Sequence, residues 1–200
     1  ATAAGLIAIE RLVAAGVSVN VTLMFSLAHV DAVAAAYVRG LEALQRSGGD
    51  VAAVMSGASL FLSRVDTLVD RQLEEISGGV LELRGKAAVA TAKLAYQRYM
   101  ARFHGPAFAA LREAGARPQY MLWASTGTKN PAYSDLLYVE PLIGPETVNT
   151  LPDTTLAALR DHGRIASTLA EGTAAAERLF AELSLFGVNL DDAGERLQRE

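Results

Sequence analysis

The chain has 200 residues, of which 51% are hydrophobic and 20% are charged, so it is long enough to bury one sizeable core. A formal net charge of −4 lacks the basic excess with which proteins neutralise nucleic-acid phosphates, and the absence of cysteine excludes disulfides and thiolate metal sites. We therefore expect one domain over residues 1–200, no nucleic-acid partner, and a cytoplasmic location as the default.

A membrane span needs roughly 20 consecutive apolar residues. The most hydrophobic region is interrupted by polar and charged residues, among them Asn20, Asp31 and Arg39. The apolar N-terminal segment carries Glu10 and Arg11 in its middle, which is typical of a helix and not of a signal peptide. We expect no membrane partner.

Helical and strand patterns alternate from the first residues onward. Apolar residues at helical spacing in 3–15 are followed by Gly16, and the alternation in 17–25, rich in β-branched residues, favours a strand. Later segments are separated by glycine and proline in the same way. The expected order is helix 3–15, strand 17–25, helix 28–46, strand 51–62, helix 65–76 ended by the glycine pair 78–79, helices 86–103 and 107–114, strands 119–125 and 136–143, helices 152–162 and 170–186, and a weaker helix from residue 190.

Strands that alternate with helices pair in parallel through right-handed crossovers, so the pattern predicts an α/β protein. Four strands are predicted, whereas a closed parallel barrel needs about eight strands and about 250 residues. Catalytic side chains of such barrels lie at the carboxyl ends of the strands. The polar residues at the predicted strand ends are therefore the candidate site residues.

Two strands carry polar residues at a spacing of two. Asn20 and Thr22 share one face of the first strand, where they either line a site or satisfy each other within the core. Ser59, Phe61 and Ser63 share a face of the second strand. Both strands are therefore predicted to present a polar face.

Arg64 follows the second strand directly. A guanidinium at the end of a strand suits a phosphate, because its planar donors bind two oxygens at once. The alternative for Arg64 is a surface ion pair with Asp66 or Asp70 of the next helix.

The loop after the third strand, residues 123–131, places Ser125, further hydroxyl residues and a glycine before Lys129. Such a loop can present backbone N–H groups and an ammonium to an anion, although the spacing of a P-loop is absent. A Schiff base on Lys129 would need a desolvated amine, and its glycine and asparagine neighbours favour an exposed loop instead.

Residues 147–152 either close the rim after the last predicted strand or form a loop with Pro152 at the start of a helix. His29, His104 and His162 are far apart in the sequence, and no metal-ligand spacing is present. We expect neither a metal nor a cofactor.

Four runs together resemble the bacterial transaldolases, in the branch with longer inserts, and the resemblance extends across essentially the whole chain. The runs are 17–26, 59–66, 122–131 and 147–152. The resemblance implies a (β/α)8 TIM-type barrel of the pentose phosphate pathway, of which this chain covers roughly strands 5–8. It also implies transfer of a dihydroxyacetone unit from a ketose phosphate to an aldose phosphate through a lysine Schiff base, without a metal or cofactor.

The matching motifs imply roles for individual residues. Asn20 and Thr22 correspond to fifth-strand residues that hydrogen-bond the intermediate and a catalytic water. Lys129 stands where many relatives have an arginine. The residues that the resemblance assigns to substrate are Ser59, Phe61 and Ser125 for the sugar, and Arg64 and Lys129 for the phosphate.

In the family, the Schiff-base lysine lies near the end of the fourth strand, just before the segment that matches Ala1-Thr2, and the acidic residues that assist proton transfer lie on earlier strands. We therefore expect a fragment truncated at both ends and inactive alone, from a standalone enzyme or from one fused to an isomerase. A half barrel exposes strand edges beside 17–25 and 136–143, so we expect a homodimer or pairing with the missing half. The alternatives are a non-catalytic α/β module that binds sugar phosphates or another protein, and an aldolase of the same fold family.

Overall fold

The computed structural model describes residues 2–76 and 80–199, so the glycine pair 78–79 predicted to end a helix lies outside the described residues. No helix in the described part of the chain is both long and apolar enough to cross a membrane. The elements, with η for 3-10 helices, are α1 (Ala3–Ala14), β1 (Val19–Met24), α2 (Leu27–Arg46), η1 (Val51–Ala53), β2 (Ser56–Phe61), α3 (Ser63–Glu74), η2 (Val80–Leu83), α4 (Ala87–Phe103), η3 (Pro106–Phe108), α5 (Ala109–Glu113), β3 (Tyr120–Ala124), η4 (Glu140–Leu142), β4 (Thr147–Asn149), α6 (Asp153–His162), α7 (Thr173–Leu185) and α8 (Leu190–Arg199).

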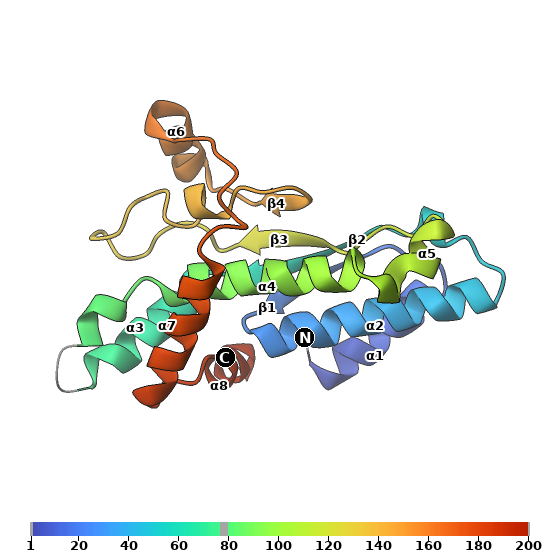
Figure 1. The fold of residues 1–200 in the computed structure, drawn as a ribbon, viewed down its shortest axis with the longest axis horizontal. Helices are drawn as coiled ribbons and strands as arrows, with labels where there is room; N and C mark the ends of the chain where they lie inside the picture. Colours follow the sequence, from blue (N-terminus) through green and yellow to red (C-terminus); the bar gives the residue numbers. More distant parts are fainter. Residues whose placement is uncertain (1, 77–79, 200) are drawn as a thin grey trace.

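The described strands form one parallel sheet in the order β1-β2-β3-β4, with Val21, Ala58, Met121 and Thr147 in register. Helices α1, α2 and α4 lie on one side of this sheet, and α6 lies beyond its β4 edge (Figure 1). The predicted α/β fold with parallel strands is confirmed.

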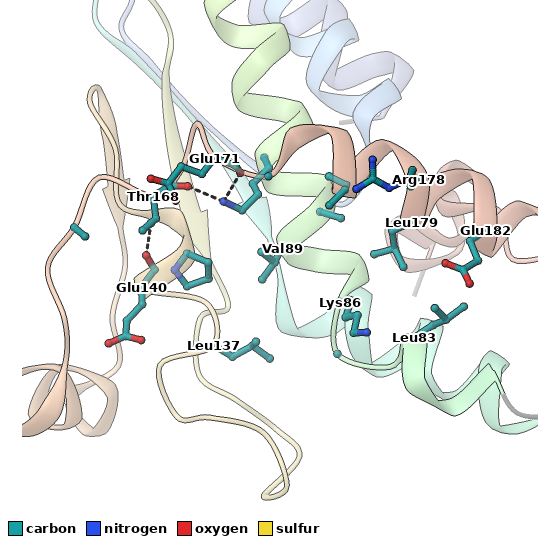
Figure 2. Close-up of a pocket in the computed structure, with 18 of the residues that line it drawn as sticks. Leu83, Lys86, Val89, Leu137, Glu140, Thr168, Glu171, Arg178, Leu179 and Glu182 are labelled. Carbon is teal, nitrogen blue, oxygen red and sulfur yellow. Dashed lines mark hydrogen bonds between the residues drawn. The ribbon is translucent and has the colours of Figure 1, made fainter.

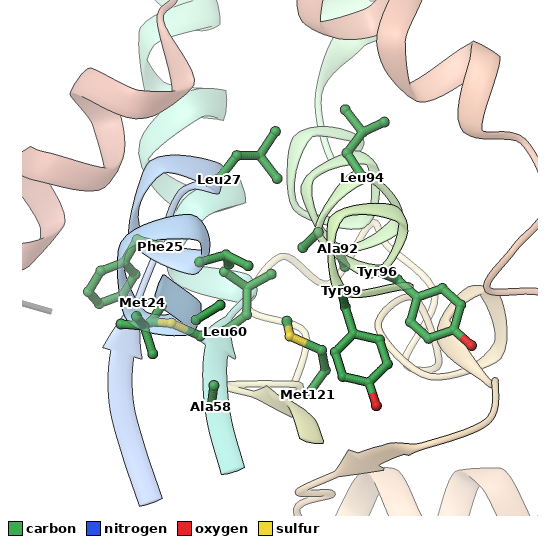
Figure 3. Close-up of a cluster of buried hydrophobic side chains, with 14 of the residues drawn as sticks. Met24, Phe25, Leu27, Ala58, Leu60, Ala92, Leu94, Tyr96, Tyr99 and Met121 are labelled. Carbon is green, nitrogen blue, oxygen red and sulfur yellow. The ribbon is translucent and has the colours of Figure 1, made fainter. Parts of the chain in front are cut away.

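The core lies between the sheet and the helices on its covered side. Met24, Leu60 and Met121 point from the strands toward Ala92 and Tyr99 of α4, and all five side chains are buried (Figure 3). Burying a large apolar side chain stabilises a fold by roughly 1.5–3 kcal/mol. This packing fixes which sheet face is covered, and it leaves the alternate residues of each strand on the opposite face.

Helix α1 packs closely on α2 because Gly40 has no side chain. A methyl group at residue 40 would lie 2.6 Å from Val13 Cβ and 2.8 Å from the Glu10 backbone oxygen. Arg39 Nε also donates a hydrogen bond to Glu10 Oε2 at 2.7 Å across this contact. The small residue therefore sets the distance between the two helices.

The predicted strand at 136–143 is wrong. The segment forms turns and the helix η4, with hydrogen bonds from Val139 N to Leu136 O and from Leu142 N to Val139 O. These three residues are buried and recur every third position, which is the period of a 3-10 helix and not of a strand. The fourth strand is instead β4, inside the segment predicted to form a rim or a loop, so the edges of the sheet are β1 and β4.

At the amino end of β4, Glu146 joins the end of α4 to the sheet. Its Oε2 accepts hydrogen bonds from Tyr99 Oη at 2.5 Å and from His104 Nε2 at 2.6 Å. Burial alone would raise the pKa of Glu146, but these two hydrogen bonds lower it below its usual value. The contact therefore favours the charged carboxylate.

Candidate functional site at the carboxyl ends of the strands

The sheet face opposite the helices carries the polar residues predicted from β1 and β2. Asn20 and Thr22 are exposed, whereas Val21 between them is buried on the helix side. Asn20 is in register with Gly57, and its Oδ1 lies 3.2 Å from the position of a Cβ at residue 57. Since strand residues alternate, Ser59 lies on this same face. In the described chain Asn20 and Thr22 are therefore exposed and do not form a buried pair.

β1 contains one extra residue near its carboxyl end. Val21 pairs with Ala58 and Met24 pairs with Leu60, so three steps along β1 match two along β2. Leu23 adopts a φ of +59° within this irregularity. Bulges of this kind occur next to functional sites, where they redirect side chains. Here the bulge changes the direction of the open-face residues at the end of β1.

Arg64 lies in the first turn of α3, directly after β2, and is exposed. Its guanidinium carbon lies 5.2 Å from the centre of the Phe61 ring, a cation–π distance. Asp66 and Asp70 are buried and bind tyrosine and backbone donors, and among the described residues neither pairs with Arg64. The predicted surface ion pair is therefore not found, and Arg64 lies beside the half-buried Phe61 at the strand end.

Ser125 joins the carboxyl ends of β2 and β3. Ser63 N donates a hydrogen bond to Ser125 O at 3.0 Å, and the two hydroxyl oxygens lie 2.8 Å apart. Ser125 has a φ of +55°, which is uncommon for a residue with a side chain. Ser63 begins α3, so the prediction that it continues the face of Ser59 along the strand is wrong.

Lys129 is exposed on the loop after β3 and lines a pocket of about 280 Å³ together with Arg71 of α3. Arg64 does not line this pocket. The structure therefore places the two predicted phosphate residues in different surroundings, with carboxylates near Lys129. The other lining residues are Asp66, Thr67, Asp70, Glu74, Asn130, Tyr133 and Tyr138.

Asp66 was not predicted as a site residue, and its burial is the clearest electrostatic feature of this region. Only 1% of the residue is exposed, and burial raises its pKa to about 6, although hydrogen bonds from Ala88 N and Tyr138 Oη favour the charged form. A signal existed in the sequence. Asp66 and Asp70 directly follow the apolar residues Val65 and Val69, which places both carboxylates on the buried arc of the helix.

A larger hollow lies elsewhere, between α4 and α7 (Figure 2). This groove of about 960 Å³ contains none of the predicted site residues. Its Lys93 Nζ donates hydrogen bonds to Thr168 O at 2.7 Å and to Glu171 O at 2.9 Å, while burial lowers the pKa of the amine. Lys93 therefore ties the segment before α7 to α4.

The histidines lie apart in the structure as well. His29 Nδ1 accepts a hydrogen bond from Phe25 N at 3.2 Å, so its Nε2 carries the proton that is donated to Glu195 of α8 at 3.1 Å. In residues 2–76 and 80–199, no group of three or more His, Cys, Asp or Glu side chains is arranged to hold a metal ion. The role of His29 in the structure is to join α8 to the first turn of α2.

Comparison with known proteins gives one consistent result. A family model described as transaldolase/fructose-6-phosphate aldolase matches residues 1–200. Proteins named transaldolase are 58% identical in Thiobacillus denitrificans over 98% of this chain, 49% in Saccharopolyspora erythraea over 100%, and 50% in Mycolicibacterium smegmatis over 100%. The matches cover 55%, 55% and 54% of those proteins, so the chain spans about half the length of these relatives.

Proposed function

The chain belongs to the transaldolase/fructose-6-phosphate aldolase family, and on that premise we propose that it supplies the sugar-phosphate-binding wall of a transaldolase. Such an enzyme transfers a dihydroxyacetone unit between sugar phosphates in the pentose phosphate pathway. The observation that carries the proposal is the shared open face of β1 and β2, with Asn20, Thr22 and Ser59 directed to one side and Arg64 at its end. Phosphorylated sugars are charged and do not cross membranes, so we expect the enzyme in the cytoplasm with its substrates.

We assign separate parts of the substrate to the residues of this face. Arg64 binds the phosphate, because its guanidinium is exposed and has planar donors. Asn20 and Thr22 hydrogen-bond the bound intermediate, and Ser59 and Phe61 line the sugar pocket. Ser125 closes the pocket at the end of β3, and Lys129 supplies a second cation from the following loop.

The Schiff base requires a lysine amine at the strand ends that reacts with the ketone of the sugar and releases water. The sequence has three lysines, at positions 86, 93 and 129, and none of them lies on the open face of the sheet. Lys93 donates to two carbonyl oxygens, and Lys129 is exposed rather than desolvated. We therefore propose that the 200-residue chain alone forms no Schiff base and that the amine comes from a segment outside these residues.

We further propose that the sheet is half of a closed barrel. Parallel sheets are normally covered on both faces, yet Val148 of β4 is 51% exposed and Asn20 and Thr22 are exposed on the uncovered face. The edges of β1 and β4 have no neighbouring strand in the described part of the chain. The barrel would close if β1 and β4 each paired in parallel with an edge strand of another half barrel. That half is either a second copy of the chain or the other half of the enzyme.

Calorimetric titration with fructose 6-phosphate tests the binding proposal. Replacement of Arg64 by alanine should weaken binding by about tenfold or more, since a charge-assisted hydrogen bond is lost. Arg11→Ala is the matched control, because Arg11 is also an exposed helical arginine but precedes the amino end of β1. Equal affinity of the Arg64→Ala variant and the unmodified chain would remove the phosphate assignment.

Reduction with borohydride in the presence of fructose 6-phosphate tests the Schiff-base proposal. Mass spectrometry should detect no adduct on the isolated chain, and a stable adduct on Lys129 would contradict the proposal.

Light scattering tests the proposal that the chain is half of a closed barrel. The chain of 21.1 kDa should behave as a dimer, and a monodisperse monomer with full α/β circular dichroism would contradict the closure of two copies.

A further inference from the structure

The loop between β3 and η4 is a structured unit. Thr128 Oγ1 donates a hydrogen bond to Ser134 O at 2.9 Å, and Asn130 accepts bonds from Ala132 N at its side-chain oxygen and from Tyr133 N at its backbone oxygen. Bonds of this kind replace regular secondary structure in a turn. Lys129 lies inside this turn, so its position follows that of the loop as a whole.

Two tyrosines attach this loop to α3. Tyr133 Oη donates to Asp70 Oδ2 at 2.6 Å, and Tyr138 Oη donates to Asp66 Oδ2 at 2.8 Å. The aspartates are four residues apart on one face of α3, so the two attachments lie one helical turn apart. We call these four residues the aspartate–tyrosine clasp.

The two aspartates of the clasp also bind backbone N–H groups at the start of α4 and just before it. The second oxygen of Asp70 accepts a hydrogen bond from Gly85 N at 2.9 Å, and that of Asp66 accepts one from Ala88 N at 2.8 Å. The Tyr133 ring lies so close to Gly85 that a Cβ there would be 2.8 Å from Tyr133 Cζ, and Gly85 has a φ of +68°. Each carboxylate therefore binds one backbone donor and one tyrosine. The Tyr133 ring leaves no room for a side chain at residue 85, which is a glycine.

The same helix carries Arg64 in its first turn, two residues before Asp66. From these contacts we infer that the aspartate–tyrosine clasp consists of positioning residues, which hold the Lys129 loop at a fixed place along α3. The clasp thereby fixes where the Lys129 loop lies, and with it the position of the cation that Lys129 can offer to a bound phosphate ester. The recognition part of this inference rests on the proposed function, whereas the attachment of the loop does not.

Limited trypsin digestion measures the attachment directly, because Lys129–Asn130 is a cleavable bond within the loop. Tyr133→Phe removes only the hydroxyl group and should raise the rate of cleavage after Lys129 by about tenfold, since cleavage follows the population of the opened loop. Cleavage after the exposed Arg46 at the end of α2 should stay unchanged. Tyr138→Phe should raise the rate at Lys129 as well.

Tyr37→Phe is the matched control, because Tyr37 Oη also donates one hydrogen bond, to Arg117 O at 2.9 Å, and Arg117 precedes the amino end of β3 whereas the Lys129 loop follows its carboxyl end. This variant separates local release from a general loss of stability. A Lys129 cleavage rate in Tyr133→Phe that equals the rate in Tyr37→Phe would overturn the inference.

Affinity for fructose 6-phosphate tests the consequence for recognition. Tyr133→Phe should bind several-fold more weakly than the unmodified chain, and Tyr37→Phe should bind as the unmodified chain does. Unchanged binding by Tyr133→Phe, together with loss of binding in Arg64→Ala, would overturn the recognition part alone. No binding by the unmodified chain would overturn the proposed function and the recognition part together, while the cleavage rates still decide whether the clasp holds the loop.

Discussion

Replacement of Asp66 by asparagine should change how the stability of the protein depends on pH. Asp66 is 1% exposed, and burial raises its pKa from 3.8 to about 6. In the unfolded chain the carboxyl group loses its proton near pH 4, whereas in the folded protein it keeps the proton up to about pH 6. Between these values the folded state binds more protons than the unfolded state, so stability falls as the pH rises.

The magnitude follows from the interval between the two pKa values. One pH unit corresponds to about 1.4 kcal/mol, so an interval of about two units lowers the free energy of unfolding by about 3 kcal/mol. The asparagine side chain of the variant would keep an oxygen acceptor for Ala88 N and would have an N–H donor for Tyr138 Oη, but it carries no titrating proton. The stability of the wild type minus that of the Asp66→Asn variant should therefore fall by about 3 kcal/mol from pH 4 to pH 7 and then stay constant.

Urea unfolding at a series of pH values provides the measurement, with the fluorescence of the single, fully buried Trp123 as the signal. Taking the difference between the two proteins cancels the titration of carboxylates that both share. A difference that is constant from pH 4 to pH 7, or that grows with pH, would refute the conclusion that Asp66 is ionised at a cost inside the folded protein.

Three further changes test other parts of the structure. Gly40→Ala should lower the stability by about 1–3 kcal/mol in thermal unfolding, because the methyl group would push the α1 backbone away from α2. Glu146→Gln should lower the stability by about 1 kcal/mol at neutral pH, because Tyr99 and His104 lose a charged acceptor. The difference in stability between the two proteins should shrink as the pH falls below about 4.5, because Glu146, whose pKa is lowered in the folded protein, then becomes protonated. Gly57→Ala adds a methyl group 2.6 Å from Leu122 Cδ1 and 3.2 Å from Asn20 Oδ1 on the open face, so it should displace both side chains and weaken the binding of fructose 6-phosphate in calorimetric titration.

The sequence predicted the parts of the fold in which local pattern and tertiary packing agree. The first strand was recognised because β-branched and polar residues alternate around Val21, which the sheet buries. The strand predicted at 136–143 was wrong because Leu136, Val139 and Leu142 are buried at the spacing of a 3-10 turn, and a short apolar run does not reveal its period. β4 has only three residues, too few to show a strand pattern of its own.

The candidate site was predicted only in part. Spacing alone placed Asn20 and Thr22 on one face, because alternation is a property of the strand itself. The bulge at Leu23 could not be predicted, since it depends on the register with β2. The partners of Asp66 and Asp70 lie 72 and 63 residues further along the chain, and no local pattern identifies tyrosines at such a distance.

The raised pKa of Asp66 indicates that this carboxylate is not buried for the sake of stability. A group whose pKa is raised by burial lowers the stability of the folded protein at neutral pH, so stability does not explain an aspartate at this position. An amide would satisfy the Ala88 donor equally well, but it would offer no charged acceptor to the Tyr138 hydroxyl. If the Asp66→Asn variant is more stable at pH 7 and yet shows faster cleavage after Lys129, then the negative charge serves to hold the loop and not to stabilise the fold. If it is more stable with unchanged cleavage, the tyrosine contact alone holds the loop, and the charge has no part in it.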